Sequence, residues 1–148
     1  MTQPVAPPQS PRPCRKRILI VDDVKSTRQG LKALLAQSPA CKVVGEAANG
    51  QEALQWLAEN PADVVVMDMR MPVMDGLTAT RYLRRQGTPV KIIILSAAMA
   101  SRDAALAAGA DAFVNKIGSP YALLTALHRL VAELEKISTS VAEGYSND

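Results

Sequence analysis

The chain contains, at residues 62–76, the stretch ADVVVMDMRMPVMDG, which decides its fold. The first half is an unbroken apolar run, short and rich in β-branched residues. Such a run is typical of a buried strand in a parallel sheet rather than of a helix. It ends at a single carboxylate, Asp68, and a loop with Pro72 and Gly76 follows. Because open α/β sheets place their chemistry at the carboxyl ends of strands, Asp68 is the first candidate for a functional residue.

The composition predicts one domain with an aliphatic core. The chain has 148 residues, of which 48% are hydrophobic and only 3% aromatic, and this length suffices to bury a core. No apolar run approaches the roughly 20 residues needed to cross a bilayer, and no secretory signal is evident. Cys14 and Cys41 lie far apart, which argues against a disulfide framework or a zinc site. We expect a cytoplasmic protein without membrane association.

The net charge of +3 comes from one short segment. Arg12, Arg15, Lys16 and Arg17 precede the first predicted strand, and no acidic residue does, so the remaining chain is near neutral. A short basic flank is usually solvated rather than a binding patch. We therefore expect no direct nucleic-acid binding by this segment.

Apolar runs and breaker residues predict alternating strands and helices. The predicted strands are 18–21, 41–47, 64–67, 90–95 and 112–114. The predicted helices run from a Ser26 or Thr27 cap to about 38, and over 50–59, 77–85, 98–108 and about 120–136. This alternation is typical of an α/β fold with a doubly wound five-stranded parallel sheet. We predict the flavodoxin-like strand order 2-1-3-4-5, a (βα)5 arrangement.

The two ends of the chain differ from the body. Residues 1–15 hold five of the ten prolines and cannot bury much apolar surface, so we expect a disordered basic extension. Residues 137–148 are mostly polar, and we expect the last helix to fray there. The predicted domain is therefore 16–136.

Five polar residues fall at one edge of the predicted sheet. Asp22 and Asp23 end the first strand, Asp68 the third and Ser96 the fourth, and Lys116 follows the fifth. Carboxylates this close together raise each other's pKa unless a cation lies among them, and oxygen ligands with retained waters suit Mg²⁺. With the lysine and the hydroxyl added, the predicted crevice suits a dianionic phosphoryl group.

Each of these residues has an ordinary alternative interpretation. An Asp after a strand often caps a helix or closes a turn, and Ser96 or Lys116 alone would more often be structural. The five together, each at the appropriate strand end, favour a site.

Four segments of the sequence carry a family resemblance. They read ILIVDD at 18–23, VMDMRMPVMDG at 66–76, ILSA at 94–97 and GADAFVNK at 109–116. Together they resemble the CheY-like receiver domain of two-component response regulators, over roughly residues 16–135. The segments at 44–50 and 116–120 resemble receivers attached to LuxR-type helix-turn-helix outputs, which act in transcription regulation.

The resemblance implies a phosphoacceptor site. Asp68 would receive a phosphoryl group from a sensor histidine kinase or a phosphotransfer protein. Asp23, Asp68 and the backbone carbonyl of Arg70 would bind Mg²⁺, with Asp22 acting through water.

The resemblance also implies a phosphoryl pocket and a switch. Ser96, Ala97 and Lys116 would bind phosphoryl oxygens, and Ser96 and Phe113 would move together. This would change the surface of the fourth helix, fifth strand and last helix, around Leu106, where a partner or a second copy would bind as a homodimer. The only catalysis implied is the chain's own phosphorylation and dephosphorylation. A lone aromatic such as Phe113 can also simply fill core.

One position departs from the common pattern: Ile117 follows the lysine where many receivers carry proline. A cis peptide bond at this position is therefore not expected.

Three rival classes make different demands on the sequence. A degenerate receiver acting by protein contacts alone would usually lack one of the site residues. A phosphatase of the haloacid dehalogenase type would want an Asp where Arg70 stands, and a flavodoxin-like cofactor binder would want a Ser/Thr/Gly-rich loop at residues 22–25. No GxGxxG or Walker motif is present. The controlled output, and whether the chain is a fragment, stay open.

Overall fold

A computed structural model describes the backbone of residues 15–145 and the side chains of residues 15–136. The strands are β1 (Lys16–Val21), β2 (Cys41–Ala47), β3 (Val64–Asp68), β4 (Lys91–Ser96) and β5 (Ala112–Asn115). The helices are α1 (Lys25–Leu35), α2 (Gly50–Glu59), α3 (Gly76–Arg85), α4 (Arg102–Ala108) and α5 (Tyr121–Tyr145), with a 3-10 turn η1 (Met99–Ser101) before α4.

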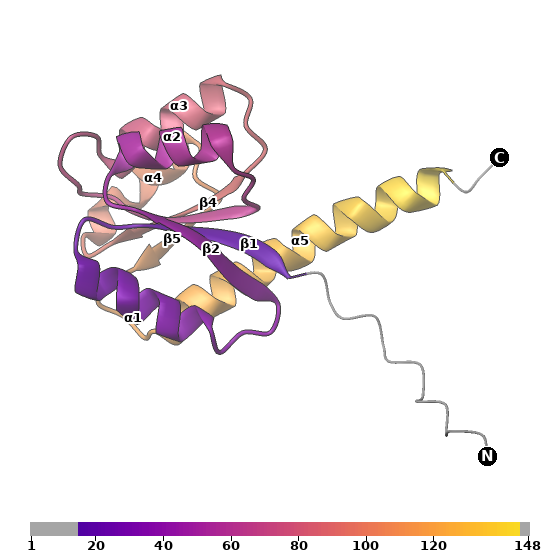
Figure 1. Cartoon of the computed structure of the whole chain (residues 1–148), viewed down its shortest axis with the longest axis horizontal. Coiled ribbons are helices and arrows are strands. Elements are labelled where there is room, and N and C mark those ends of the chain that lie inside the picture. Colours follow the sequence, from indigo (N-terminus) through magenta and orange to yellow (C-terminus); the bar gives the residue numbers. More distant parts are fainter. Residues whose placement is uncertain (1–14, 146–148) are drawn as a thin grey trace, which may run out of the picture.

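The five strands form one parallel sheet in the order β2-β1-β3-β4-β5. This confirms the predicted fold class and strand order. Helices α1 and α5 cover one face of the sheet, and α2, α3 and α4 cover the other (Figure 1). The chain therefore has three layers, and β1 and β3 lie side by side at the centre.

Each sheet face has its own aliphatic core, as the strand sequences require. Alternate residues of the central strands contribute to the two clusters: Ile18 and Val66 pack toward α1 and α5, whereas Leu19 and Val65 pack toward α2 and α3. Strand β3 is buried along its whole length, because a parallel sheet covered on both faces has no solvated side. The sheet is thus a rigid platform for the residues at its carboxyl edge.

The main differences from the predicted boundaries lie in three helices, whereas the strand ends shift by one or two residues. Helix α1 begins at Lys25 after Val24, without a side-chain cap, so Ser26 and Thr27 lie inside the first turn instead of capping it. The predicted 98–108 helix is split into η1 and the short α4. The last helix does not end near 136, since the backbone of α5 continues to Tyr145 and extends away from the body (Figure 1).

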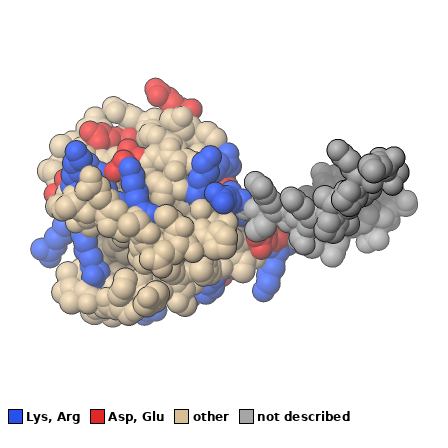
Figure 2. Space-filling model, turned by 60° about the horizontal axis from the view of Figure 1, so that its bottom comes forward, with Lys and Arg blue, Asp and Glu red and all other residues tan. Residues whose placement is uncertain are grey.

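Three further predictions concern the chain ends, the surface charge and membrane spans. The predicted disordered extension falls on residues 1–14, which lie outside the described residues, as do 146–148. On the face shown in Figure 2, lysine and arginine side chains form separate groups rather than one basic patch. In the described part of the chain, no helix combines the length and apolar character needed to span a membrane.

A half-buried arginine, Arg84, connects the C-terminal turn of α3 to the turn between α4 and β5. The Arg84 guanidinium donates to the Asp111 carboxylate at 2.6 Å and also to three backbone carbonyls, those of Gly109, Thr88 and Val90. Asp111 in turn accepts from the Ile92 backbone N–H. Asp111 also pairs with the Lys91 ammonium at 3.8 Å, so Arg84 and Asp111 together link α3, β4 and the α4–β5 turn.

We predict that Arg84→Ala lowers the free energy of unfolding by about 2 kcal/mol, because it removes the closest charged partner of Asp111 and the side-chain donor of three carbonyls. Urea unfolding of the variant and the wild type measures the difference in the free energy of unfolding. The neighbouring Arg85 is exposed, and Arg85→Ala is the matched control, with an expected change within about 0.5 kcal/mol. Equal stabilities of the two variants would contradict a stabilising role for the Arg84 hydrogen bonds.

Gly76 allows the chain to pass directly over the end of β3. A Cβ at this position would collide with the backbone oxygen of Asp68, and the Gly76 N–H bonds to the Met69 carbonyl at 2.9 Å. Gly30, by contrast, lies in α1 with open space around its missing side chain. Glycine is thus needed at residue 76 and costs helix stability at residue 30.

We predict that Gly76→Ala destabilises the protein by about 1–3 kcal/mol through overpacking. Gly30→Ala should instead stabilise it by about 0.5–1 kcal/mol, since alanine favours the helix. Chemical denaturation of both variants tests the pair. A neutral Gly76→Ala would show that the β3–α3 loop can move aside, and would contradict the requirement for glycine.

Candidate functional site

Three carboxylates meet at the carboxyl edge of the sheet. Asp22 follows β1 and Asp68 ends β3, and these strands are paired up to Val21 and Met67. Carboxylate oxygens of Asp22, Asp23 and Asp68 all lie within 4.8 Å of one another. Asp22 is fully buried and Asp68 is 8% exposed, whereas Asp23 is exposed. The predicted convergence of these residues is therefore present.

Lys116 supplies the positive charge within this cluster. Its Nζ lies 3.0 Å from Asp22 Oδ2 and 3.2 Å from Asp68 Oδ2. Its backbone N–H bonds to the Ser96 carbonyl at 2.9 Å, which holds the start of the β5–α5 loop against β4. No cis peptide bond occurs in residues 15–145, so the expectation of a trans loop at Ile117 is correct.

A hollow of about 350 Å³ opens beside Asp68. It is lined by Asp68, Arg70, Ser96, Ala97, Ala98 and Lys116. The Ser96 side chain is buried, and its hydroxyl accepts from the Ala98 N–H at 3.1 Å. The residues predicted to bind phosphoryl oxygens, including Ala97, thus share one cavity with the predicted acceptor.

Phe113 lies outside that hollow. It pairs in register with Ile94 on β4, while Ser96 pairs with Asn115. The half-buried ring packs against the core cluster on the α2–α4 face and also borders a hollow beside α5 that includes Arg129. The two predicted switch residues therefore stand on neighbouring strands and line two different hollows.

Burial and charge act in opposite directions on Asp68. Burial raises the pKa of Asp68, the charge and hydrogen bond of Lys116 lower it, and the Asp22 charge raises it, so the pKa lies above its usual value. Burial lowers the pKa of Lys116, but the hydrogen bond to Asp22 and the charges of Asp68 and Asp22 outweigh this, so that pKa is raised. The lysine is firmly protonated, and ionised Asp68 is only partly compensated.

The donor set fits a hydrated divalent cation. All the candidate ligands are carboxylate oxygens, the type that Mg²⁺ prefers. Lys116 engages one oxygen of Asp22 and one of Asp68, and the second oxygen of Asp22 accepts from the Val24 N–H. Among the described residues, none forms a hydrogen bond or an ion pair with the Asp23 carboxylate. Free oxygens therefore remain on Asp23 and Asp68, and water would supply the ligands that these groups do not.

Asp22 also closes a turn, because its carboxylate accepts from the Val24 N–H at 2.9 Å. This is the ordinary alternative role for an Asp that follows a strand.

Two further residues near the site were not predicted from the sequence. Asp75 caps α3, accepting from the Thr78 N–H at 2.7 Å, and Arg28 donates to the Asp22 carbonyl at 2.6 Å. An Asp just before a predicted helix was a usable signal for the cap, whereas nothing in the spacing of Arg28 indicates its acceptor.

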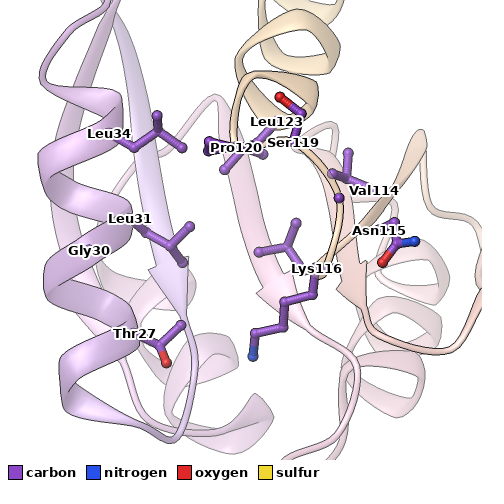
Figure 3. A pocket seen from close by; sticks show the side chains of 12 residues that line it. Thr27, Gly30, Leu31, Leu34, Val114, Asn115, Lys116, Ser119, Pro120 and Leu123 are labelled. Carbon is purple, nitrogen blue, oxygen red and sulfur yellow. The ribbon is translucent and has the colours of Figure 1, made fainter.

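A second cleft, of about 360 Å³, lies between α1 and the β5–α5 loop. Leu31 and Leu34 line it from α1, and Pro120 and Leu123 from the other side (Figure 3). The Lys116 side chain runs along this cleft, with its nitrogen at the end where Thr27 lies (Figure 3). The lysine is therefore bordered by two cavities, of which only the first contains Asp68.

Comparison with known proteins places this geometry in a family. The family model "Response regulator receiver domain" matches residues 18–128. The response regulator UvrY of Escherichia coli K12 is 35% identical over 128 residues, which cover 85% of this chain and 59% of UvrY. The chain thus spans less than two thirds of that relative.

Solved structures of response regulators are also similar to this chain. A LuxR-family two-component response regulator from Aurantimonas sp. SI85-9A1 is 32% identical with a TM-score of 0.76, covering 90% of this chain and 99% of the other. The CheY of Borrelia burgdorferi, in a CheX-CheY-BeF3-Mg+2 complex, is 26% identical with a TM-score of 0.71, covering 79% and 90%. With the family model, the relatives and the site geometry in agreement, this chain belongs to the receiver domain family of two-component response regulators.

Proposed function

We propose that this receiver accepts a phosphoryl group on Asp68 from a sensor histidine kinase or a phosphotransfer protein, in a reaction that requires Mg²⁺. One observation carries the proposal. Asp22, Asp23 and Asp68 present oxygens within 4.8 Å of one another, with Lys116 bonded to two of them, beside an open hollow. No member of the expected set is missing from the described residues, which disfavours a degenerate receiver.

Asp68 acts as the nucleophile in this proposal. One of its carboxylate oxygens forms a P–O bond as the P–N bond of phosphohistidine breaks, and the leaving imidazole nitrogen keeps the electron pair. The reaction needs ionised Asp68. Lys116, 3.2 Å away, opposes the rise in pKa that burial and Asp22 cause. The lysine thus favours the reactive form before the donor arrives.

Asp23, Asp68 and the backbone carbonyl of Arg70 are the groups that would bind Mg²⁺ directly, with Asp22 acting through water. The bound ion would offset negative charge on the phosphoryl oxygens during transfer. The oxygen-only donor set supports this assignment, and the related Borrelia protein was solved with BeF3 and Mg²⁺. Arg70 lines the hollow that adjoins Asp68.

Ser96, Ala97 and Lys116 would bind the new phosphoryl oxygens. The Ser96 hydroxyl, now bonded to Ala98 N–H, would turn toward the phosphoryl group, which adds a charge of about −1.5 to −2 at the end of β3. Movement of the β4–α4 loop with Ser96 would give Phe113, on the adjacent strand, room to turn inward. The change would reach the surface of α4, β5 and α5.

That surface is the proposed contact for an output or for a second copy of the chain as a homodimer. Leu106 is 36% exposed on α4. The likeness to UvrY and to a LuxR-family regulator favours an output in transcription regulation, supplied by other parts of a longer protein or by a partner. We assign the chain no turnover beyond phosphorylation and dephosphorylation of Asp68.

We predict that incubation with acetyl phosphate and Mg²⁺ adds one phosphoryl group to the wild type and none to Asp68→Asn. Intact-mass spectrometry measures the gain, and EDTA should abolish it. No gain by a wild type that demonstrably binds Mg²⁺ would contradict the proposal and would instead support a degenerate receiver that acts by protein contacts.

The raised pKa of Asp68 also predicts how stability depends on pH. A carboxyl whose pKa is higher in the folded than in the unfolded state lowers stability when it is ionised. This cost is fully present above the folded pKa and disappears below the unfolded value of about 3.9. Metal-free Asp68→Asn should therefore be more stable than the wild type at pH 7, and the difference should shrink as the pH falls.

Urea unfolding in EDTA between pH 7 and pH 4.5 measures this difference. Asp103, which is exposed in the first turn of α4, offers the control Asp103→Asn, which should give no stabilisation. A less stable Asp68→Asn at pH 7 would mean that Lys116 compensates Asp68 completely, which contradicts a raised Asp68 pKa.

A further inference from the structure

The backbone of Asp22 is held from both sides, through the N–H of the peptide group before it and the carbonyl of the peptide group after it. The Asp22 N–H donates to the Ala47 carbonyl of β2 at 3.1 Å. The Asp22 carbonyl, which belongs to the same peptide plane as the Asp23 nitrogen, accepts from Arg28 Nη1 of α1 at 2.6 Å. The chain leaving β1 is therefore fixed by a strand on one side and by a helix side chain on the other.

Arg28 is itself fixed in place. Its Nε donates to Glu46 Oε1 at 3.2 Å, and the other oxygen of Glu46 pairs with Lys32. Only 17% of the Arg28 side chain is exposed. Glu46 lies on β2, in register with Ile20 of β1, so the guanidinium is anchored on the sheet and its charge is largely offset.

Asp23 depends on this anchoring more than its neighbours do. The carboxylates of Asp22 and Asp68 are each held by Lys116. Asp23 is exposed, and within residues 15–136 its carboxylate has neither a hydrogen bond nor an ion pair. Its position is therefore set by the backbone that carries it, beginning with the peptide group that Arg28 holds.

We propose that Arg28 is a positioning residue for the divalent-cation site: by binding the Asp22 carbonyl it presents the Asp23 carboxylate for metal binding. The inference rests on the proposed function in taking the acidic cluster as the Mg²⁺ site. Groups of this kind, which orient metal ligands without touching the metal, typically contribute about tenfold to a hundredfold to affinity.

The charge of Arg28 makes the inference sharply testable. A cation near an acidic site repels a second cation, so a residue that acted only through its charge would weaken Mg²⁺ binding, and its removal would tighten it. A residue that acts by positioning has the opposite effect. Arg28→Met keeps most of the side-chain length and separates the two roles by the sign of the change.

The experiment is Mg²⁺ titration of the metal-free protein by calorimetry. Arg28→Met should raise the Mg²⁺ Kd about tenfold to a hundredfold. Lys32→Met is the matched control, because it removes one positive charge from the same Glu46 cluster without touching Asp22, and its Kd should be unchanged or slightly lower. Glu46→Gln should weaken binding, since it both loosens Arg28 and leaves its charge uncompensated.

A second readout needs no metal. In Arg28→Met, the backbone amides of Asp22 and Val24, which bond to the Ala47 carbonyl and to the Asp22 carboxylate, should exchange hydrogen faster than in the wild type, while amides in the centre of β3 keep their protection. If Arg28→Met does not fold, Arg28→Lys serves in its place, since one ammonium cannot reach both the Asp22 carbonyl and Glu46 as the guanidinium does. Arg28→Lys should also raise the Mg²⁺ Kd and speed amide exchange, but by less than Arg28→Met.

An unchanged or lower Kd for Arg28→Met, with wild-type exchange at the Asp22 and Val24 amides, would overturn the inference. Phosphorylation of the wild type separates this result from failure of the proposed function. A wild type that is phosphorylated alongside an unaffected Arg28→Met would reject only the role of Arg28. A wild type that binds Mg²⁺ but takes no phosphoryl group would reject the phosphoacceptor function and leave the positioning role standing.

Discussion

The structure depends on one electrostatic constraint: buried carboxylates at the sheet edge must share a cation. Asp22 is fully buried and Asp68 nearly so, and two such charges without compensation would be costly. In this structure the compensating cation is the Lys116 ammonium, bonded to both. Because burial still raises the Asp68 pKa, the compensation is incomplete. A site with this residual negative charge is suited to take up a divalent cation and then a phosphoryl group.

The fold keeps this edge rigid. Strands β1 and β3 are central and covered on both faces, so the ends that carry Asp22 and Asp68 cannot shift independently. Gly76 lets the β3–α3 loop pass over Asp68. Arg28 and Glu46 tie the β1–α1 loop to the neighbouring strand. The exposed Asp23 and the hollow beside Ser96 and Ala97 are the parts left open to solvent, where an ion and a donor could enter.

Much of this could be predicted from the sequence because it depends on local pattern. The run ending at Asp68 identified a buried strand, and the strand–helix alternation with right-handed crossovers left few topologies. Convergence of Asp22, Asp23, Asp68, Ser96 and Lys116 then followed from all strands ending at one edge. What the sequence could not supply were contacts between distant elements. The bond from Arg28 to the Asp22 carbonyl depends on how α1 packs beside β2, and the four bonds of Arg84 depend on where two loops meet. The start of α1 and the length of α5 were missed because helix ends carry weak signals.

The most direct test is a crystal structure of the protein with Mg²⁺ and beryllofluoride, which mimics a phosphoryl group on a carboxylate. We predict one ion bound by Asp23, Asp68 and the Arg70 carbonyl, with beryllofluoride on Asp68 contacted by Lys116 and by a Ser96 hydroxyl that has left Ala98. Density for neither group at Asp68, at concentrations that saturate binding in solution, would contradict the phosphoacceptor role.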